Sequence, residues 1–205
     1  MHVCDVMASM FDVTRNFSDA LAALESKNLG RAEELFKQIL AIDKCNVPAM
    51  NLLVVILISM QRFAEAETFI ARAISLNQSS DVSFYNYGLI SKHLNKHHEA
   101  LRHFTRALHL NPNVAETWNG RGTVFSDLQK YDSAVSDFDR AILLDGRFGE
   151  AYANKGMSLS LLNRHDEALA AFDKALSIKS DFENAWVGRG NVLRSLKRQD
   201  RKSVV

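Results

Sequence analysis

Cysteine, proline and net charge are all scarce in this sequence, and each scarcity excludes a class of protein. Cys4 and Cys45 are the only cysteines among 205 residues, which fits neither a disulfide framework nor a zinc site. Only two prolines occur, so the chain holds no proline-rich linker. With 25 basic and 24 acidic side chains, bulk charge attracts neither nucleic acid nor a membrane surface. The low cysteine content is typical of a reducing compartment, and we expect a cytoplasmic location.

Long hydrophobic runs are also missing. The most apolar segment, Leu52 to Ile58, is far shorter than the roughly 20 residues of a membrane-spanning helix. The first residues, Met1 to Asp5, lack the basic start and apolar core of a secretion signal. We therefore expect no membrane and no nucleic acid among the partners of this protein.

What the sequence does contain is one pattern repeated every 34 residues. Glycine recurs with this period at Gly88, Gly122, Gly156 and Gly190. The same period separates small, aromatic and bulky positions, which are Ala66, Ala100, Ala134 and Ala168, then Phe104, Phe138 and Phe172, then Met50, Phe84, Trp118, Tyr152 and Trp186. A period between about 20 and 50 residues indicates stacked structural repeats that cannot bury their apolar faces alone.

The period divides the chain into five full repeats after a short N-terminal segment. The segment covers residues 1–12, and the repeats cover 13–46, 47–80, 81–114, 115–148 and 149–182, with a partial sixth at 183–205. Within a repeat, apolar residues fall at helical spacing twice, first at Trp118 and Phe125 and again at Tyr131 and Phe138. Each repeat is therefore predicted to be two helices, and the fold to be all-α.

The two helices of a repeat are predicted to separate at a polar residue. This residue follows the last leucine of the first helix, at Asn95, Gln129 and Asn163. Asp132 and Asp166 then favour the start of the second helix, through capping and through the helix dipole.

With these helices in place, the sequence resembles the tetratricopeptide repeat family. That family has a bulky residue, then Leu-Gly and Tyr, and later Ala, Phe, Ala and Pro. The matching residues of the fourth repeat are Trp118, Gly122, Phe125, Ala134, Phe138 and Ala141, with Arg121 in place of the leucine. The resemblance covers residues 13–205, although Pro112 is the only late proline. It implies a right-handed α-solenoid of tandem antiparallel helix pairs, whose first helices line a concave groove.

The resemblance also implies which side chains face that groove. The second, fifth, sixth, ninth, twelfth and thirteenth positions of the first helices supply the candidate partner-binding residues, which are Leu52, Val55, Ile58, Tyr85, Asn86, Leu89, Asn119, Thr123, Asn154, Met157, Asn191 and Arg194. With Glu116, Asp127 and Glu150 included, this floor runs from apolar, through acidic and polar, to basic. It suits an extended peptide held by side-chain amides. The asparagines could equally be ordinary solvated residues, and the Leu52–Ile58 helix could be buried against the first repeat.

Two further columns of the predicted groove, one with glycines and one with glutamates, bear on which ligands it can bind. Gly120 and Gly188 fall on a groove-facing column, where we expect them to leave room. The chaperone-tail binders of the family grip a terminal carboxylate with a lysine column that here holds Glu116 and Glu150. Because these carboxylates would repel such a ligand, we expect no binding of heat-shock chaperone tails.

Candidate catalytic and metal-binding patterns fail on spacing. His98 to His103 nearly reads as a zinc-protease motif, but the second histidine comes one residue too late to share a helix face. His93, His97 and His109 would need converging geometry to hold a metal, and His97 occupies a packing column. We expect no catalytic site, no metal and no cofactor.

The partial sixth repeat has a first helix without a second. Trp186, Val192 and Leu193 are therefore expected to lose the helix that would cover them. Because repeat arrays ordinarily need a polar cap, this end could mediate self-association, or the sequence could be part of a longer parent.

Two functions of different classes follow. We predict a non-enzymatic protein–protein interaction scaffold that binds a protein or peptide in the groove. The alternative arises from residues 154–159, 172–176 and 188–194, which resemble the arrays that precede the catalytic region of bacterial O-linked N-acetylglucosamine transferase homologues. In that case the chain is the substrate-recognition array of a glycosyltransferase without its catalytic domain.

Overall fold

The computed structural model describes residues 3–203, with side chains described from residue 12 to residue 197, and every regular element in this range is an α-helix. The eleven helices of this range are α1 (Val3–Glu25), α2 (Leu29–Ile42), α3 (Val47–Ser59), α4 (Phe63–Leu76), α5 (Asp81–His93), α6 (His97–Leu110), α7 (Ala115–Asp127), α8 (Tyr131–Leu144), α9 (Gly149–Leu161), α10 (His165–Ile178) and α11 (Glu183–Ser203). The predicted all-α fold is confirmed. Since α1 begins at Val3, the first predicted repeat, 13–46, starts inside a helix.

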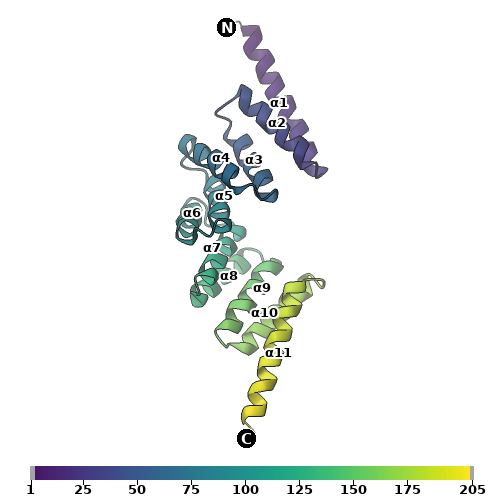
Figure 1. Cartoon of the computed structure of the whole chain (residues 1–205), viewed down its shortest axis with the longest axis vertical. Coiled ribbons are helices and arrows are strands. Elements are labelled where there is room, and N and C mark those ends of the chain that lie inside the picture. The colour runs from purple at the N-terminus through teal and green to yellow at the C-terminus, as the bar shows by residue number, and fades with distance from the viewer. Residues whose placement is uncertain (1–2, 204–205) are drawn as a thin grey trace. The chain divides into compact units, whose positions relative to one another are not determined.

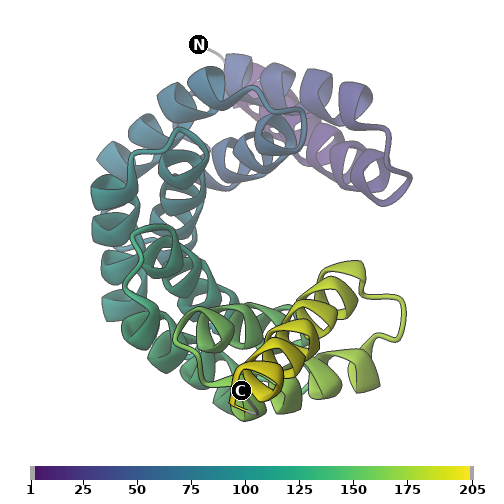
Figure 2. The same ribbon diagram turned by 60° about the horizontal axis from the view of Figure 1, so that its bottom comes forward.

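The chain forms two compact halves, Met1–Lys96 and His97–Val205. In each half consecutive helices pack against one another as antiparallel pairs (Figure 1). The first helices of neighbouring pairs also touch: α3 contacts α5, and α9 contacts both α7 and α11 (Figure 2). The second helices make no contacts of that extent with each other within the described residues. Each half is therefore a solenoid that curves toward its first helices, and we call the exposed side of these helices the first-helix face of that half.

The predicted breaks between the helices of a pair are confirmed. The residue at each break has a left-handed backbone conformation with φ of 58–59°, at Lys27, Gln61, Asn95, Gln129 and Asn163. After α7, Gln129 N–H donates to the Ser126 carbonyl (2.9 Å) and Lys130 N–H to the Phe125 carbonyl (2.8 Å). These two hydrogen bonds close the C-terminus of the helix and satisfy backbone carbonyls that would otherwise lack partners.

The second helices begin without the predicted aspartate caps. Lys130 and Arg164 hold the N-cap positions of α8 and α10, and neither makes a side-chain cap hydrogen bond. Asp132 and Asp166 lie one residue inside their helices, so they act on the helix dipole but do not cap. The capping part of that prediction is wrong because the N-cap position lies two residues before each aspartate.

A phenylalanine from each second helix of the C-terminal half packs against a first helix, and Phe172 packs against two, α9 and α11. Phe104, Phe138 and Phe172 are fully buried. A Cβ atom on Gly122 would lie 2.7 Å from Cε1 of Phe138, within the same repeat, and one on Gly120 would lie 2.8 Å from Cε1 of Phe104, in the preceding repeat. The prediction that Gly120 opens the groove is therefore wrong, since this glycine is buried under an aromatic ring.

Gly188 and Gly190, two residues apart on α11, provide a matched test of this packing. A Cβ atom on Gly188 would overlap the buried ring of Phe172, whereas a Cβ atom on Gly190 would meet no heavy atom within 4 Å. We expect Gly188→Ala to lower the free energy of unfolding by about 1–3 kcal/mol through overpacking. Gly190→Ala should instead raise it by up to about 1 kcal/mol through helix propensity. Urea denaturation of both variants checks this pair, and equal effects would refute the packing assignment.

In the N-terminal half, ion pairs join successive second helices on the side away from the first-helix face. Arg62, at the N-cap of α4, bonds Glu33 of α2 and Glu65 of its own helix, each at 2.7 Å. Lys37 also contacts Glu33, at 2.6 Å. The hydrogen bonds from Arg62 and then Lys37 hold the pKa of Glu33 below its usual value. Glu33 therefore stays ionised at neutral pH and links α2 to α4.

Candidate protein-interaction face

The first-helix face of the C-terminal half consists of outward side chains of α7, α9 and α11. Asn119 and Thr123 come from α7, Met157 from α9, and Asn191 and Arg194 from α11. Each of these residues is at least partly exposed. Since α9 packs between α7 and α11, the structure brings these candidates onto neighbouring helices.

Two of the predicted asparagines bond each other across this face. Asn154 Nδ2 donates to Asn119 Oδ1 at 3.0 Å, which joins α9 to α7. Each side chain is half-buried, and the pair leaves Asn119 Nδ2 as a donor and Asn154 Oδ1 as an acceptor with no partner among the described residues. A donor beside an acceptor matches the carbonyl and N–H groups of an extended peptide.

Hydroxyl groups on the same helices are used within the protein. Thr123 Oγ1 donates to the Gly120 carbonyl at 2.7 Å, so its proton is not available to a ligand. The Ser126 and Ser158 hydroxyls lie 2.7 Å apart and join α7 to α9. These bonds hold the helices that carry the asparagine pair and restrict Thr123 to accepting hydrogen bonds from a ligand.

Apolar side chains beside the asparagines are more extensive than the sequence pattern predicted. Met157 is 51% exposed, and Leu161 and Val187, which the prediction omitted, are 58% and 57% exposed. Asn154, Met157 and Leu161 are spaced three and four residues apart, so they share one face of α9. Leu161 and Val187 occupy the thirteenth and fifth positions of their first helices, so the positional rule could have found both.

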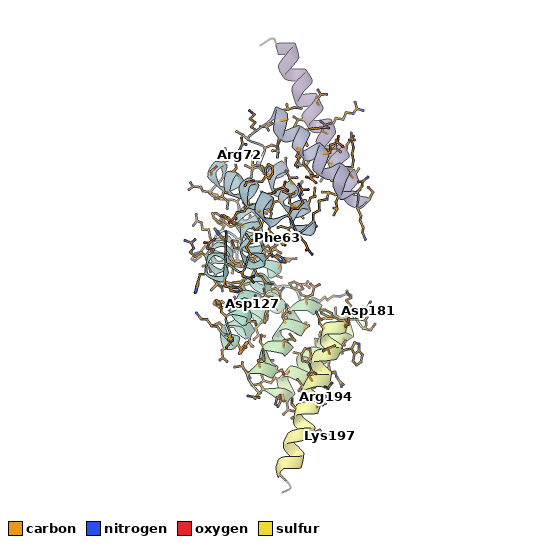
Figure 3. The ribbon with its side chains drawn as sticks, viewed as in Figure 1. Phe63, Arg72, Asp127, Asp181, Arg194 and Lys197 are labelled. Atoms are coloured by element: carbon orange, nitrogen blue, oxygen red, sulfur yellow. The ribbon has the colours of Figure 1, made fainter. Side chains whose placement is uncertain are left out.

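The charge on this face changes sign between helices. Glu116 and Asp127 on α7 and Glu150 on α9 are exposed, as are Arg194 and Lys197 on α11. Figure 3 shows Asp127 at the end of α7, and Arg194 and Lys197 along α11. The acidic-polar to basic order predicted for these repeats is present in the C-terminal half.

In the N-terminal half, the predicted apolar groove residues are largely part of the core. Leu52 and Ile58 are half-buried and pack against the main hydrophobic cluster, whereas Val55 is 45% exposed on the first-helix face. Tyr85 and Leu89 are half-buried. Packing within this half therefore accounts for most of the apolar character of the Leu52–Ile58 helix.

Asn86 is wrongly assigned to the binding surface. It is 2% exposed, and its Nδ2 atom is buried without a hydrogen-bond partner among the described residues. Asn86 occupies the same repeat column as Gly120 and Gly188, which face the second helix of the preceding repeat. A residue in this column points away from a ligand unless, like Asn154, it can reach sideways to the neighbouring first helix.

The prediction that three residues of α11 lack a covering helix is confirmed for two of them. Trp186 and Leu193 are exposed, as predicted. Val192 is fully buried in the cluster formed with α9 and α10, so its predicted exposure is wrong. It lies on the side of α11 that faces the preceding repeat.

His93, one of the histidines considered as a metal ligand, packs against an aromatic ring. The His93 ring stacks on Phe63, with centroids 4.7 Å apart, and burial followed by the charge of Lys92 lowers the pKa of His93. In the part of the chain with described side chains, no group of three or more His, Cys, Asp or Glu residues could hold a metal ion.

None of the helices described between residues 3 and 203 combines the length and apolar character that a membrane span needs.

Comparison with known proteins identifies the repeat. Tetratricopeptide repeat family models match residues 23–83, 93–142 and 149–182. Among solved structures, the MamA protein is 21% identical with a TM-score of 0.69, covering 84% of this chain and 96% of its own. YrrB, titled a TPR protein with an unusual peptide-binding site, is 22% identical with a TM-score of 0.67, covering 85% and 90%.

PilF of Pseudomonas aeruginosa is 15% identical with a TM-score of 0.80, and the alignment covers 94% of this chain and 88% of PilF. These identities show a shared fold alone. No curated protein matches the chain by sequence. The family models together match more than half of the chain, with the helix pairs and the buried phenylalanines in the expected columns. The chain belongs to the tetratricopeptide repeat family.

Proposed function

We propose that this protein is a non-enzymatic scaffold that binds a segment of a partner protein on the first-helix face of its C-terminal half. The observation that carries the proposal is the Asn119–Asn154 pair together with the exposed side chains of Met157 and Leu161 on α9 and of Val187 on the neighbouring α11. Apolar side chains exposed together mark interaction surfaces more often than isolated ones do. The adjacent amides supply the directional contacts.

The chemistry of the face indicates an extended segment with at least one apolar side chain. Such a side chain would contact Met157 and Leu161, while its flanking peptide groups bond the asparagine amides. Basic groups of the segment would lie toward Glu116 and Asp127, and acidic groups toward Arg194. YrrB, whose title reports a peptide-binding site, supports this use of the fold without identifying the ligand.

The proposal is tested by comparing partner capture from a lysate of the source organism with two matched variants. The face variant combines Met157→Ser, Leu161→Ser and Val187→Ser, and the control combines Ile42→Ser and Leu76→Ser, which remove exposed apolar surface from second helices. We expect at least one partner whose affinity falls about tenfold or more in the face variant, because exposed apolar anchors carry much of such binding energy.

Captured partners are measured by quantitative mass spectrometry and then individually by calorimetry. Circular dichroism checks that both variants keep their helices. The proposal is contradicted if every captured partner binds the face variant as well as it binds the control variant.

Self-association, a glycosyltransferase origin and the cytoplasmic location stay predictions. The exposed Trp186 and Leu193 on α11 favour self-association through the uncovered end of the C-terminal half. The alternative of a glycosyltransferase recognition array rests on the resemblance of residues 154–159, 172–176 and 188–194 to such arrays, and it requires a catalytic domain encoded in frame with this chain.

A further inference from the structure

A separate pocket lies at the edge of the C-terminal half, where the loop before α7 meets the end of α8. Its volume is about 410 Å³, and its lining residues are Pro112, Asn113, Trp118, Arg140, Leu143 and Leu144. Trp118 Nε1 donates to the Pro112 carbonyl at 2.8 Å, which fixes the indole ring as one wall. We call this site the edge pocket. Half of its lining comes from the second helix α8, so it is distinct from the first-helix face.

Leu143 is the most unusual residue of the edge pocket. It is 74% exposed, more than any other large hydrophobic residue with a described side chain. The same column of the other full repeats holds Ala41, Ser75, His109 and Ser177. The repeat fold therefore has no need of a large apolar side chain at this position.

Arg140 is the only charged residue that lines the edge pocket, and it has no hydrogen-bond or ion-pair partner among the described residues. The nearest acidic neighbour along α8, Asp139, pairs with Lys155 at 2.6 Å. A shallower depression beside the pocket shares Arg140 and Leu143, and its other cation, Arg164, pairs with Glu167 at 2.7 Å. The guanidinium of Arg140 is thus available to an external carboxylate.

We propose that the edge pocket is a second docking site, which binds a partner-protein segment carrying an aliphatic residue next to an aspartate or glutamate. The aliphatic side chain lies between Trp118 and Leu143, and the neighbouring carboxylate pairs with Arg140. Charge complementarity selects the acidic neighbour, because a carboxylate beside a planar guanidinium forms the stronger, charge-assisted hydrogen bonds. The volume lies within the range of about 300–1,000 Å³ that is usual for binding pockets.

The test uses the full chain and a displayed library of random 12-residue peptides. Selection is run on the wild-type chain and on two variants, Leu143→Ser and Arg140→Gln. Both replacements already occur in their columns, as Ser75 and Ser177 and as Gln38, so the repeat tolerates them. Met157→Ser serves as the control for the first-helix face.

We expect the wild-type chain to enrich peptides with an aliphatic residue beside an acidic one. Leu143→Ser should weaken the binding of these peptides about tenfold or more, as expected for the loss of a buried leucine contact. Arg140→Gln should remove the acidic preference and keep the aliphatic one, and Met157→Ser should change neither. This last control separates the edge pocket from the proposed function, since either site can fail alone.

An enriched peptide is then titrated into isotope-labelled protein. The chain has two tryptophans, and each indole N–H donates to a loop carbonyl, Trp118 to Pro112 and Trp186 to Ser180. Binding in the edge pocket shifts the Trp118 indole signal and leaves that of Trp186 in place.

Any one of three results from the selection and the titration would overturn the proposal. They are a selection with no peptide sensitive to Leu143→Ser, a set of Leu143→Ser-sensitive peptides without an acidic preference, and equal shifts of both indole signals. A concentration-dependent dimer that Leu143→Ser abolishes would also overturn it, because a second copy of the chain would then occupy the pocket.

Discussion

Phe172→Ala is expected to lower the free energy of unfolding by about 3–5 kcal/mol, the usual cost of removing a buried aromatic ring. Phe172 is fully buried, and its ring occupies the space that side chains on Gly156 and Gly188 would need. Because both facing residues are glycines, no side chain there can move into the cavity that the substitution leaves. The surrounding helices therefore have little means of filling it. Urea denaturation followed by circular dichroism measures the loss, and hydrogen exchange should place it in α9–α11.

A double variant tests whether the ring and the glycine are coupled. In the wild-type chain Gly188→Ala is expected to destabilise, but in the Phe172→Ala background the added methyl enters the vacated space and should stabilise. This change of sign is the signature of a direct contact in a double-mutant cycle. The half-buried Phe182 provides the control, since Phe182→Ala should cost less than Phe172→Ala. An effect of Gly188→Ala that is the same in both backgrounds would falsify the assignment.

Asp137→Ala should cost about 3 kcal/mol or more, because it leaves a largely buried guanidinium without its counter-charge. Arg121 Nε and Nη2 donate to the two Asp137 carboxylate oxygens at 2.7 and 2.8 Å, and the carboxylate side chain is only 6% exposed. The guanidinium also lies 4.9 Å from the Trp118 ring centroid. Thermal and urea denaturation measure the loss.

The chain contains an exposed counterpart of this ion pair. Arg189, in the column of Arg121, pairs with Asp173 at 2.6 Å, but both side chains are substantially exposed. Asp173→Ala should therefore cost less than about 1 kcal/mol. Replacing both Arg121 and Asp137 by leucine should recover most of the stability that Asp137→Ala loses, since no charge then remains buried. Equal losses in Asp137→Ala and Asp173→Ala would contradict the difference in burial as the cause.

The sequence predicts the helices of this protein better than it predicts where individual side chains point. The 34-residue period locates the helix pairs and their breaks, because those depend on local backbone geometry and on one repeated apolar pattern. It also identifies Phe138 and Phe172 as repeat positions, and both prove to be fully buried. The helix positions, the breaks and the buried columns occur in each repeat, so the five repeats give the same prediction five times.

The errors fall where repeats differ from each other or where two repeats meet. Asn86 and Asn154 share a column, yet Asn86 is buried and Asn154 bonds Asn119, because the outcome depends on the neighbouring helix. Val192 is covered by the preceding repeat, although the described residues include no second helix of its own repeat. Single-helix patterns cannot distinguish these cases. The edge pocket could not be predicted from the sequence for the same reason, since its walls come from a loop and two helices.

The uniform breaks between paired helices also limit how this chain can change. Every break passes through one left-handed residue, and the next helix begins two residues later. One inserted residue would rotate the following helix by about 100° and move it along its axis by about 1.5 Å. Phe138 would then leave its place under Gly122. New binding properties are therefore obtained by exchanging side chains on helices of constant spacing, and within each half a partner that contacts several repeats meets them at regular intervals.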